Sequence, residues 1–444
     1  MEKHLIPAGY KQTEVGVIPE DWSVDTLLNV CEKITDGTHD TPKPTTLGVP
    51  FLTAIHVKEN KIDFGSCYYL PKSIHDEIYK RCNPQKNDVL MVNIGAGVAT
   101  TALVIVDYEF SLKNVALLKP NKKKIIGAYL NFYQSYVKNT VYDSLATGGA
   151  QAFLSLSQIS QLKISLPSCI EEQTAIANAL SDVDALIAAL EKLINKKSAI
   201  KTAAMQQLLT GKKRLPPFDQ LNAGYKQTEL GEIPGDWKVN DIGHFNPFIT
   251  SGSRGWADYY SNFGSLFVRI TNMRRSSIYL DLNNNKYVSL PVLSAEGKRT
   301  ELQNDDVLIS ITADVGISGF VDDSVEKPAY INQHIALVRF RDEEICSKFV
   351  SYYLAGESIQ KLFRGSTDQG AKAGMNLTAI GAIKIAVPSK PEQIAIANVL
   401  ADIDKDLETL QQRLHKTQQI KQGMMQELLT GKTRLVKPQG APNA

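Results

Sequence analysis

The chain is organised around a stretch that occurs twice. The first copy is Glu172–Leu215, EQTAIANALSDVDALIAALEKLINKKSAIKTAAMQQLLTGKKRL, and the second is Glu392–Leu435, EQIAIANVLADIDKDLETLQQRLHKTQQIKQGMMQELLTGKTRL. In each copy apolar residues recur at alternating steps of four and three, which is typical of a helix that packs along one partner helix. The predicted helix-pairing residues are Ile176, Leu180, Val183, Ile187, Leu190 and Ile194 in the first copy, and Ile396, Leu400, Ile403, Leu407, Leu410 and Leu414 in the second.

Each copy is long enough for one continuous helix. No Pro or Gly occurs from Glu172 to Thr210, and Gly211 and Gly431 stand where a helix stop is expected. At 1.5 Å per residue, such a helix is roughly 58 Å long. The stepping stops after Ile194 and Leu414, since the next strongly apolar residues, Ile200 and Ile420, come six positions later. We therefore expect a seam in the first half of each helix and a re-registered second half ending at Leu208–Leu209 and Leu428–Leu429.

The repeat extends beyond the helices. Gly9–Val24 (GYKQTEVGVIPEDWSV) matches Gly224–Val239 (GYKQTELGEIPGDWKV) at 12 of 16 positions, and Gly149–Ser168 matches Gly370–Ser389 more loosely. The segments between align poorly, so we expect one scaffold that carries two different surfaces. The predicted parts are a globular domain at 1–168, a helix at 169–215, a second domain at 216–389, a second helix at 390–436 and a disordered tail at 437–444.

The sequence predicts both strands and helices in the two middle segments. Short apolar and β-branched runs bounded by Gly, Asn, Asp or Pro predict strands. These runs are Asp88–Ile94, Thr101–Val106, Val115–Leu118, Phe267–Ile270 and Val307–Ile311, with Leu162–Leu166 and Ile383–Val387 before the long helices. Ile125–Ser144 and Glu344–Phe363 carry aromatics at near-helical spacing, which we interpret as core packing rather than base stacking. The fold class is therefore α+β, with two mixed α/β domains, two long antiparallel coiled-coil helices and a pseudo-two-fold internal repeat.

Composition sets the broad class. The net charge of +2 indicates nothing about nucleic acid, so a binding face would have to be a local patch. Five cysteines without a CxxC pair argue against a disulfide framework or a zinc site and for a reducing compartment. The start has no apolar signal region, and no apolar run approaches 18 residues. We expect a cytoplasmic protein that does not contact a membrane.

Some segments resemble catalytic or cofactor-binding motifs, but none of them matches such a motif in full. Gly95–Thr100 lacks the third glycine of a dinucleotide fingerprint and precedes another strand-like run, which favours a tight turn. Asn246-Pro247-Phe248 resembles the pocket of amino-methyltransferases but lacks the second Pro and a glycine-rich cofactor loop. Thr35–Pro42 is polar, yet two carboxylates and one His in such a loop are more typical of a hydrogen-bonded turn than of a catalytic or metal site. With no phosphate loop either, we expect no catalytic residue and no metal on this chain.

Basic residues gather in one segment. Ser251–Thr300 holds seven basic residues against three acidic ones, and Arg269–Arg275 reads RITNMRR. Arginine and asparagine make the bidentate contacts that read guanine and adenine edges, so this run favours DNA contact. In the first half the basic residues are sparser, and Lys122–Lys124 fit a solvated face or a DNA contact equally well.

Three motifs, each present twice in the same order around unlike middles, resemble one known family. GYKQTE-x-G-x-I-P-x-D-W, EQxAIANxLxDxD and LLTGKxRL resemble the DNA-specificity subunit of type I restriction–modification systems over nearly the whole chain. The resemblance implies that each middle is a target-recognition domain and each long helix a conserved spacer. It also implies no cofactor on this chain, with S-adenosylmethionine on two modification subunits, and ATP and Mg²⁺ on partner subunits that include the restriction (motor and nuclease) subunits.

Two matching helices that pair antiparallel would give a tandem duplication a pseudo-two-fold axis. Each domain would then read one half of a bipartite, asymmetric site in double-stranded DNA, with the helices setting the gap and docking the modification subunits. We expect the re-registered helix halves to pack on the opposite recognition domain or on the modification subunits, so that Lys or Asp at Leu208 or Leu428 would impair assembly more than folding. The residues predicted to bind DNA are Thr38, His39, Lys43, Asn93, Gln151, Ser253, Arg254, Asn272, Arg274, Arg275 and Lys372.

Two other readings use the same sequence. A non-enzymatic scaffold whose two domains bind proteins would suit the long helices equally well, and it would show no salt-sensitive, sequence-selective DNA binding. A self-contained methyltransferase would need the cofactor loop that is missing here, and it would bind S-adenosylmethionine without partners.

Overall fold

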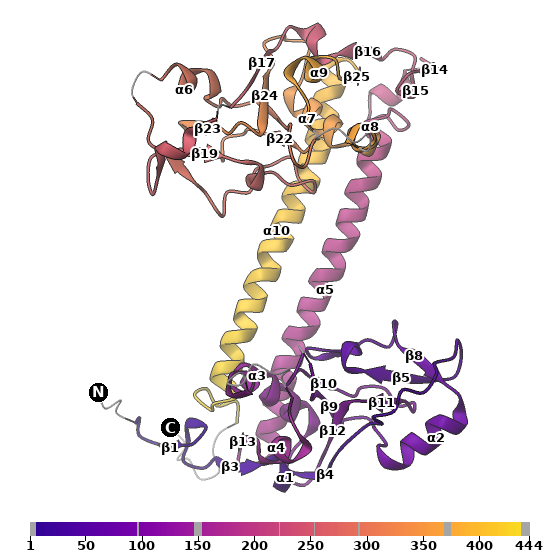
Figure 1. Cartoon of the computed structure of the whole chain (residues 1–444), viewed down its shortest axis with the longest axis vertical. Helices are drawn as coiled ribbons and strands as arrows, with labels where there is room; N and C mark the ends of the chain where they lie inside the picture. The colour runs from indigo at the N-terminus through magenta and orange to yellow at the C-terminus, as the bar shows by residue number, and fades with distance from the viewer. Residues whose placement is uncertain are drawn as a thin grey trace. The chain divides into compact units, whose positions relative to one another are not determined.

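The structure, a computed structural model, describes residues 6–95, 97–145, 153–221, 223–252, 254–291, 294–367 and 374–436. The chain divides into two compact units, of which the first comprises Met1–Glu191 and Arg413–Ala444 and the second Lys192–Gln412. Each unit therefore combines one globular domain with part of each long helix (Figure 1).

The two repeated stretches form single helices of 39 residues each, α5 (Ile170–Leu208) and α10 (Lys390–Leu428). Gly211 and Gly431 follow their C-terminal ends with φ of 69° and 70°, in the left-handed region that favours glycine. A Cβ at Gly211 would also lie 2.4 Å from the Pro234 ring. The predicted helix stops are thus confirmed, and close packing at the stop also requires glycine.

The helices run antiparallel within each unit. In the first unit Asp184 of α5 pairs with Lys421 of α10, and in the second unit Lys201 of α5 pairs with Asp404 of α10, each with a nitrogen–oxygen distance of 2.5 Å. In the second unit Lys197 also pairs with Asp406, and in the first unit Glu172 pairs with Arg434 just beyond α10, so within each unit partner numbers fall on α10 as they rise on α5. Asp184 and Lys201 have their counterparts, Asp404 and Lys421, 220 positions along the chain. The predicted antiparallel pairing is confirmed within each unit, and the predicted internal repeat is confirmed by the equivalent contacts that the two units make.

The expected re-registration of the seam is wrong. All twelve predicted pairing residues are buried or half-buried, but the four–three stepping continues through Lys197 and Lys201 on α5, and through Thr417 and Lys421 on α10. Ile200 and Ile420 are instead 47% and 49% exposed. The seam accepts lysines because acidic residues of the partner helix face them, as Asp406 faces Lys197.

The first domain is built on a four-stranded antiparallel sheet in the order β10-β9-β12-β4. Its strands are β4 (Cys31–Asp36), β9 (Val89–Val92), β10 (Thr101–Leu103) and β12 (Val115–Pro120). Packed around it are helices α1 (Leu27–Val30), α2 (Lys72–Arg81), α3 (Gly127–Leu145) and α4 (Leu156–Gln161), and a sheet of β5 (Val49–Thr53), β8 (Tyr68–Leu70) and β11 (Ser111–Lys113). Three strand pairs complete it: β1 (Tyr10–Thr13) with β2 (Gly16–Pro19), β3 (Ser23–Thr26) with β13 (Lys163–Leu166), and β6 (Val57–Lys58) with β7 (Lys61–Ile62).

The second domain repeats that plan, with the sheet order β22-β21-β24-β17. Its strands are β17 (Phe248–Ser251), β21 (Val307–Ser310), β22 (Ser318–Phe320) and β24 (Ile335–Arg339). A second sheet holds β18 (Tyr260–Ser261), β19 (Ser265–Val268), β20 (Tyr287–Val288) and β23 (Ala329–Ile331), and the helices are α6 (Ala295–Thr300), α7 (Ser347–Ala355), α8 (Glu357–Thr367) and α9 (Leu377–Gly381). The pairs β14 (Tyr225–Thr228) with β15 (Gly231–Pro234), and β16 (Lys238–Asp241) with β25 (Lys384–Val387), match their counterparts in the first domain. Two middles that align poorly in sequence therefore share one fold.

The aromatic residues at helical spacing are core residues, as predicted. Tyr129 of α3, and Phe349 and Tyr352 of α7, are fully buried. Tyr136 and Tyr142 are exceptions, because they lie on the exposed side of α3.

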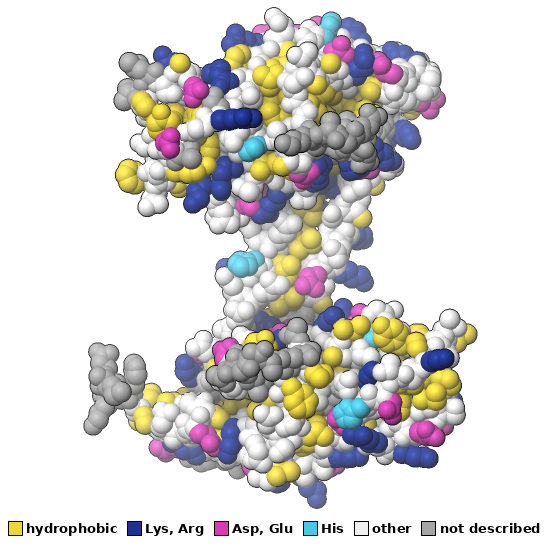
Figure 2. All heavy atoms as spheres, in the orientation of Figure 1, with side chains coloured by type: hydrophobic (Ala, Val, Ile, Leu, Met, Phe, Trp, Pro, Cys, Tyr) yellow, Lys and Arg dark blue, Asp and Glu magenta, His cyan; other side chains and the backbone are white. Residues whose placement is uncertain are grey.

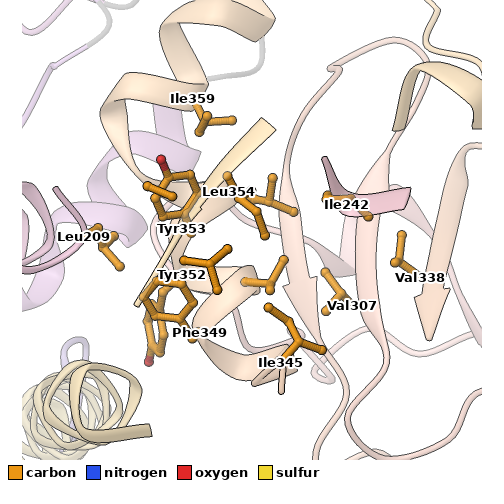
Figure 3. Close-up of a cluster of buried hydrophobic side chains, with 14 of the residues drawn as sticks. Leu209, Ile242, Val307, Val338, Ile345, Phe349, Tyr352, Tyr353, Leu354 and Ile359 are labelled. Carbon is orange, nitrogen blue, oxygen red and sulfur yellow. The ribbon is translucent and has the colours of Figure 1, made fainter. Parts of the chain in front are cut away.

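Each long helix ends inside the globular domain of the unit in which it finishes. Leu208 and Leu209 join the core of the second domain, where Leu209 lies beside Tyr353 (Figure 3). Leu428 and Leu429 join the core of the first domain in the same way. The expected packing on the opposite domain is confirmed. The prediction that a charge at Leu208 would impair assembly more than folding is wrong, because Leu208 is only 4% exposed within the domain core.

An arginine after each long helix completes the packing at that end. Arg434 makes paired bonds to Asp21 (2.8 Å each) and to Glu172 (2.6 and 2.9 Å), and Trp22 donates its indole N–H to Glu172. The bond from Arg434 lowers the pKa of Asp21. In the second unit Arg214 holds Asp236 and Glu392 in the same arrangement. In the part of the chain that the structure describes, no helix is long and apolar enough to cross a membrane.

We expect Leu208→Asp to unfold the second unit, because it places an unpaired charge in a packed core and removes a buried side chain whose loss alone costs about 2–5 kcal/mol. Amide hydrogen exchange should lose protection across Lys192–Gln412 while the first domain stays protected. The control is Ile200→Asp, eight positions earlier on an exposed side of the same helix. Equal effects of the two changes would contradict the assignment of Leu208 to the core.

Candidate nucleic-acid interface

The polar loops of the first domain lie together at one end of its main sheet. β4 and β9 end at this edge and β10 and β12 begin there, so the loops at 37–48, 93–100 and 113–114 meet. Gly37 allows the closest approach, since a Cβ there would lie 1.9 Å from the Leu112 carbonyl oxygen. Ile94 also forms a β-bridge with Phe153, which brings a fourth segment to the edge.

Thr38 and His39 lie at the centre of this edge. The Nδ1 of His39 is 2.8 Å from the Asn114 side-chain oxygen, and its Nε2 is 3.1 Å from Asp36. Thr38 accepts a bond from the Asp40 backbone N–H, which makes the stretch a hydrogen-bonded turn as predicted. An exposed imidazole held by two partners presents its ring edge to solvent in a fixed orientation.

The second domain builds the equivalent edge from different side chains. β17 and β21 end there and β22 and β24 begin there, so Arg254, the loop at 311–317 and His334 come together. Gly252 is the counterpart of Gly37, with a virtual Cβ only 2.3 Å from the Asn332 backbone. His334 bonds to Thr312, and Thr312 forms a β-bridge with Gly374.

The arginines of RITNMRR are tied within the domain. Arg275 reaches the edge, where it pairs with Asp314 and donates to the Val315 carbonyl at 3.0 Å, and it also bonds Gln360 of α8. Arg274 pairs with Asp281. Asn272 is 2% exposed, because its amide caps the turn that follows Arg269 and bonds the Asp281 carbonyl. In this conformation Asn272 organises the turn rather than presenting a free amide.

The predicted DNA-binding residues are thus only partly brought together. Thr38 and His39 share one edge with Lys43, which is exposed in the loop after β4. At the other edge Arg275 contacts the loop at 311–317, and exposed Arg254 follows β17, which ends there. Asn93 lies at the first edge but is buried, and its side-chain oxygen has no hydrogen-bond partner. Gln151, Ser253 and Lys372 lie outside the described residues. All of these assignments remain predictions.

Several edge residues escaped prediction. Asn114 orients His39, Asp314 holds Arg275, and His334 lies at the second edge. A signal for Asn114 was present, because an Asn immediately before a strand suits the left-handed turn that it adopts at φ 51°. Nothing in the local sequence marks Asp314 as a partner of Arg275.

The basic segment Ser251–Thr300 of the second domain has fewer side chains available to contact DNA than its composition suggests. Arg269 donates to the Asn284 carbonyl and Arg299 to the Ser251 carbonyl at 2.6 Å. Arg254, Lys286 and Lys298 are exposed. In the face shown in Figure 2, Lys and Arg side chains alternate with acidic and hydrophobic ones rather than forming one continuous patch.

The segments that only partly match catalytic motifs form a turn and a helix end. Gly97 to Thr100 lead the chain from β9 back onto β10, with the Ala99 N–H donating to the Val92 carbonyl at 2.8 Å. Asn246 ends a short 3-10 helix in the left-handed conformation. Burial raises the pKa of Cys31 and of Cys82 to about 12, so neither thiol is ionised at neutral pH. Among residues 6–436 as far as the structure describes them, no cluster of three or more His, Cys, Asp or Glu side chains could hold a metal ion.

This geometry defines a class of protein: two domains of one fold, each with a different polar loop edge, attached to one antiparallel helix pair. The family model of the type I restriction modification DNA specificity domain matches residues 19–201 and 274–422, and the chain belongs to that family. It is a specificity subunit of a type I restriction–modification system, with two DNA-recognition domains.

Relatives of similar length match nearly the whole chain. A Methanocaldococcus jannaschii protein assigned as the type I restriction enzyme MjaX specificity subunit is 28% identical over 96% of this chain and 97% of its own. The MjaVIII specificity subunit of that organism is 24% identical over 94% of both chains. The crystal structure of the S subunit from M. genitalium has the same fold, with a TM-score of 0.60, 16% identity and coverage of 92% of this chain and 96% of the other.

We expect Arg254→Ala to weaken cognate DNA binding by about tenfold, since an Arg at the reading edge supplies either a base contact or a phosphate contact. Binding is measured with modification subunits present and at fixed salt. The control is Arg341→Ala, an exposed arginine beyond the other end of β24. A tenfold loss with Arg341→Ala and none with Arg254→Ala would show that the wrong edge has been chosen.

Proposed function

We propose that this chain is the non-catalytic DNA-reading subunit of its complex, and that each domain reads one half of a bipartite, asymmetric target. The observation that carries the proposal is that both domains present a loop edge built on the same strand order but lined by different side chains. A shared scaffold places the edges equivalently, and their different chemistry selects different bases.

The two edges differ in the groups they offer. The first presents a neutral amide and an imidazole, Asn114 and His39, with Lys43 in the same loop. The second presents Arg254 and the Asp314-bound Arg275. An arginine suits the paired acceptors of guanine, whereas the first edge offers an imidazole and a lysine, so unlike half-sites are expected.

The helix pair would set the gap between the half-sites. In each unit an ion pair between α5 and α10 fixes the register of the two helices. An arginine beyond the end of one helix also bonds a glutamate near the start of the other, Arg434 with Glu172 in the first unit and Arg214 with Glu392 in the second. A rigid spacer with fixed register holds a fixed number of base pairs, as in other two-site readers of DNA.

The same helices would dock two modification subunits, which bind S-adenosylmethionine and methylate the target. On α5, Leu193 and Ile200 of the second unit are exposed apolar residues seven positions apart, the spacing at which a helix meets a partner helix. ATP and Mg²⁺ would act on the restriction subunits, and this chain would hold none of these cofactors.

The alternative, a two-domain scaffold that only binds proteins, suits the long helices equally well, but it leaves the match to a DNA specificity domain without an explanation. An electrophoretic assay with modification subunits present separates the two functions. The proposal requires sequence-selective binding that weakens steeply as salt rises. Binding that is indifferent to both sequence and salt would support the scaffold.

Exchanging residues 25–150 for the middle segment of another family member should change one half-site and leave the other unchanged, because the main-sheet strands and three of the four segments at the first edge lie within it. Methylation-sensitive sequencing of target libraries reads both halves at once. Modularity fails if the second half-site also changes.

Inserting seven residues after Glu191 and seven after Gln412 should lengthen the gap without altering either half-site. One heptad added to each helix preserves the seam and extends the pair by roughly 10 Å, or about three base pairs at 3.4 Å each. Inserting the heptad in α5 alone is the control, since the pairs Lys201–Asp404 and Asp184–Lys421 cannot then both stay in register, and this change should abolish binding. An unchanged gap in the double insertion would rule out the spacer role.

A further inference from the structure

Lys201 occupies an unusual position in the seam of the second unit. It is 8% exposed, and its ammonium group lies 2.5 Å from Asp404 of α10. The same nitrogen donates to the Ser276 carbonyl at 2.8 Å. A side chain of the long helix therefore bonds directly to the backbone of the second domain.

Each carboxylate oxygen of Asp404, the residue opposite Lys201, has a partner. One oxygen of Asp404 faces Lys201, and the other accepts a 2.8 Å bond from the hydroxyl of Tyr352 on α7. Burial raises the pKa of Tyr352, which keeps its hydroxyl protonated and able to donate. One cluster of satisfied polar groups thus joins α5, α10, α7 and the turn at Ser276.

Helix pairing alone does not require this cluster. A buried ion pair is often no more stabilising than apolar residues of similar size, and it more often serves to fix one arrangement. The equivalent Lys421 in the first unit pairs with Asp184 and lies over the ring of Phe132, the counterpart of Tyr352. Within the described contacts of Lys421, nothing corresponds to the bond between Lys201 and Ser276.

Ser276 immediately follows Arg274 and Arg275. The backbone bond from Lys201 fixes the chain just after these arginines, while Asp314 and Gln360 hold the Arg275 side chain on the other side. A reading side chain misplaced by a fraction of an ångström loses its bidentate geometry.

We propose that Lys201 is a positioning residue for sequence discrimination by the second domain, acting through Ser276 on the loop that carries Arg274 and Arg275. This inference rests on the proposed function, in which the second domain reads one half-site. Lys201 itself contacts no DNA. It couples the spacer helix to the loop that reads bases.

The test uses the full chain with its modification subunits and a DNA library randomised at both half-sites. The main variant is Lys201→Met with Asp404→Leu and Tyr352→Phe, which removes both charges together with the hydroxyl that donates to Asp404, and leaves an apolar seam. Its matched control is Lys421→Met with Asp184→Leu in the first unit, where Phe132 already stands in the place of Tyr352. Lys201→Arg keeps the charge and a donor, and thermal unfolding of every variant is measured alongside.

The main variant should lose about tenfold in discrimination at the half-site of the second domain, with the other half-site and the gap unchanged and the unfolding temperature close to that of the unmodified protein. The matched control should leave that half-site unaffected, and Lys201→Arg should restore much of the discrimination. Equal weakening for all sequences, or an unchanged half-site, would overturn the proposal. If the unmodified protein shows no bipartite selectivity, the proposed function fails instead, so the two failures are distinct.

Discussion

The seam between α5 and α10 is the constraint on which the rest of the structure depends. Each helix carries a narrow apolar stripe that it cannot bury alone, and in each unit the stripes meet antiparallel. Apolar steps of four and three repeat every seven residues, so apolar contacts alone would tolerate a slip of one heptad. A slip in either direction would place Lys201 opposite Ala397 or Gln411 rather than Asp404. The buried charges therefore make one register better than its neighbours.

The same duplication explains why the chain can carry two specificities. Contacts that hold a domain to the helices recur 220 residues along the chain, as Arg434 with Glu172 recurs as Arg214 with Glu392. Backbone bridges recur at the loop edges, as Ile94 with Phe153 recurs as Thr312 with Gly374, but the side chains there differ, since His39 and Asn114 at the first edge give way to Arg254 and His334 at the second. Residues that bind the scaffold together are thus kept alike, while those that face outward differ. A recognition surface can change without disturbing the frame.

Periodic features were predictable from the sequence and pairwise ones were not. Strands such as Val89–Val92 and Val307–Ser310 were found because alternation and turn residues mark them locally. The continuation of the seam through Lys201 was missed, because a lysine there looks like an interruption until Asp404, 203 positions away, is brought beside it. For the same reason, the composition of the second domain overstated its free positive charge, since Arg274 and Arg275 are paired with Asp281 and Asp314.

The central claim is that one chain with two unlike reading edges on a fixed spacer specifies one bipartite DNA target. Sequencing of modified bases in the host genome, with and without the gene for this chain, tests it most directly. We expect one methylated motif, made of two different half-sites at a constant gap, to disappear with the gene. A modification pattern that persists without the gene, or that is lost from a palindromic motif, would contradict the claim.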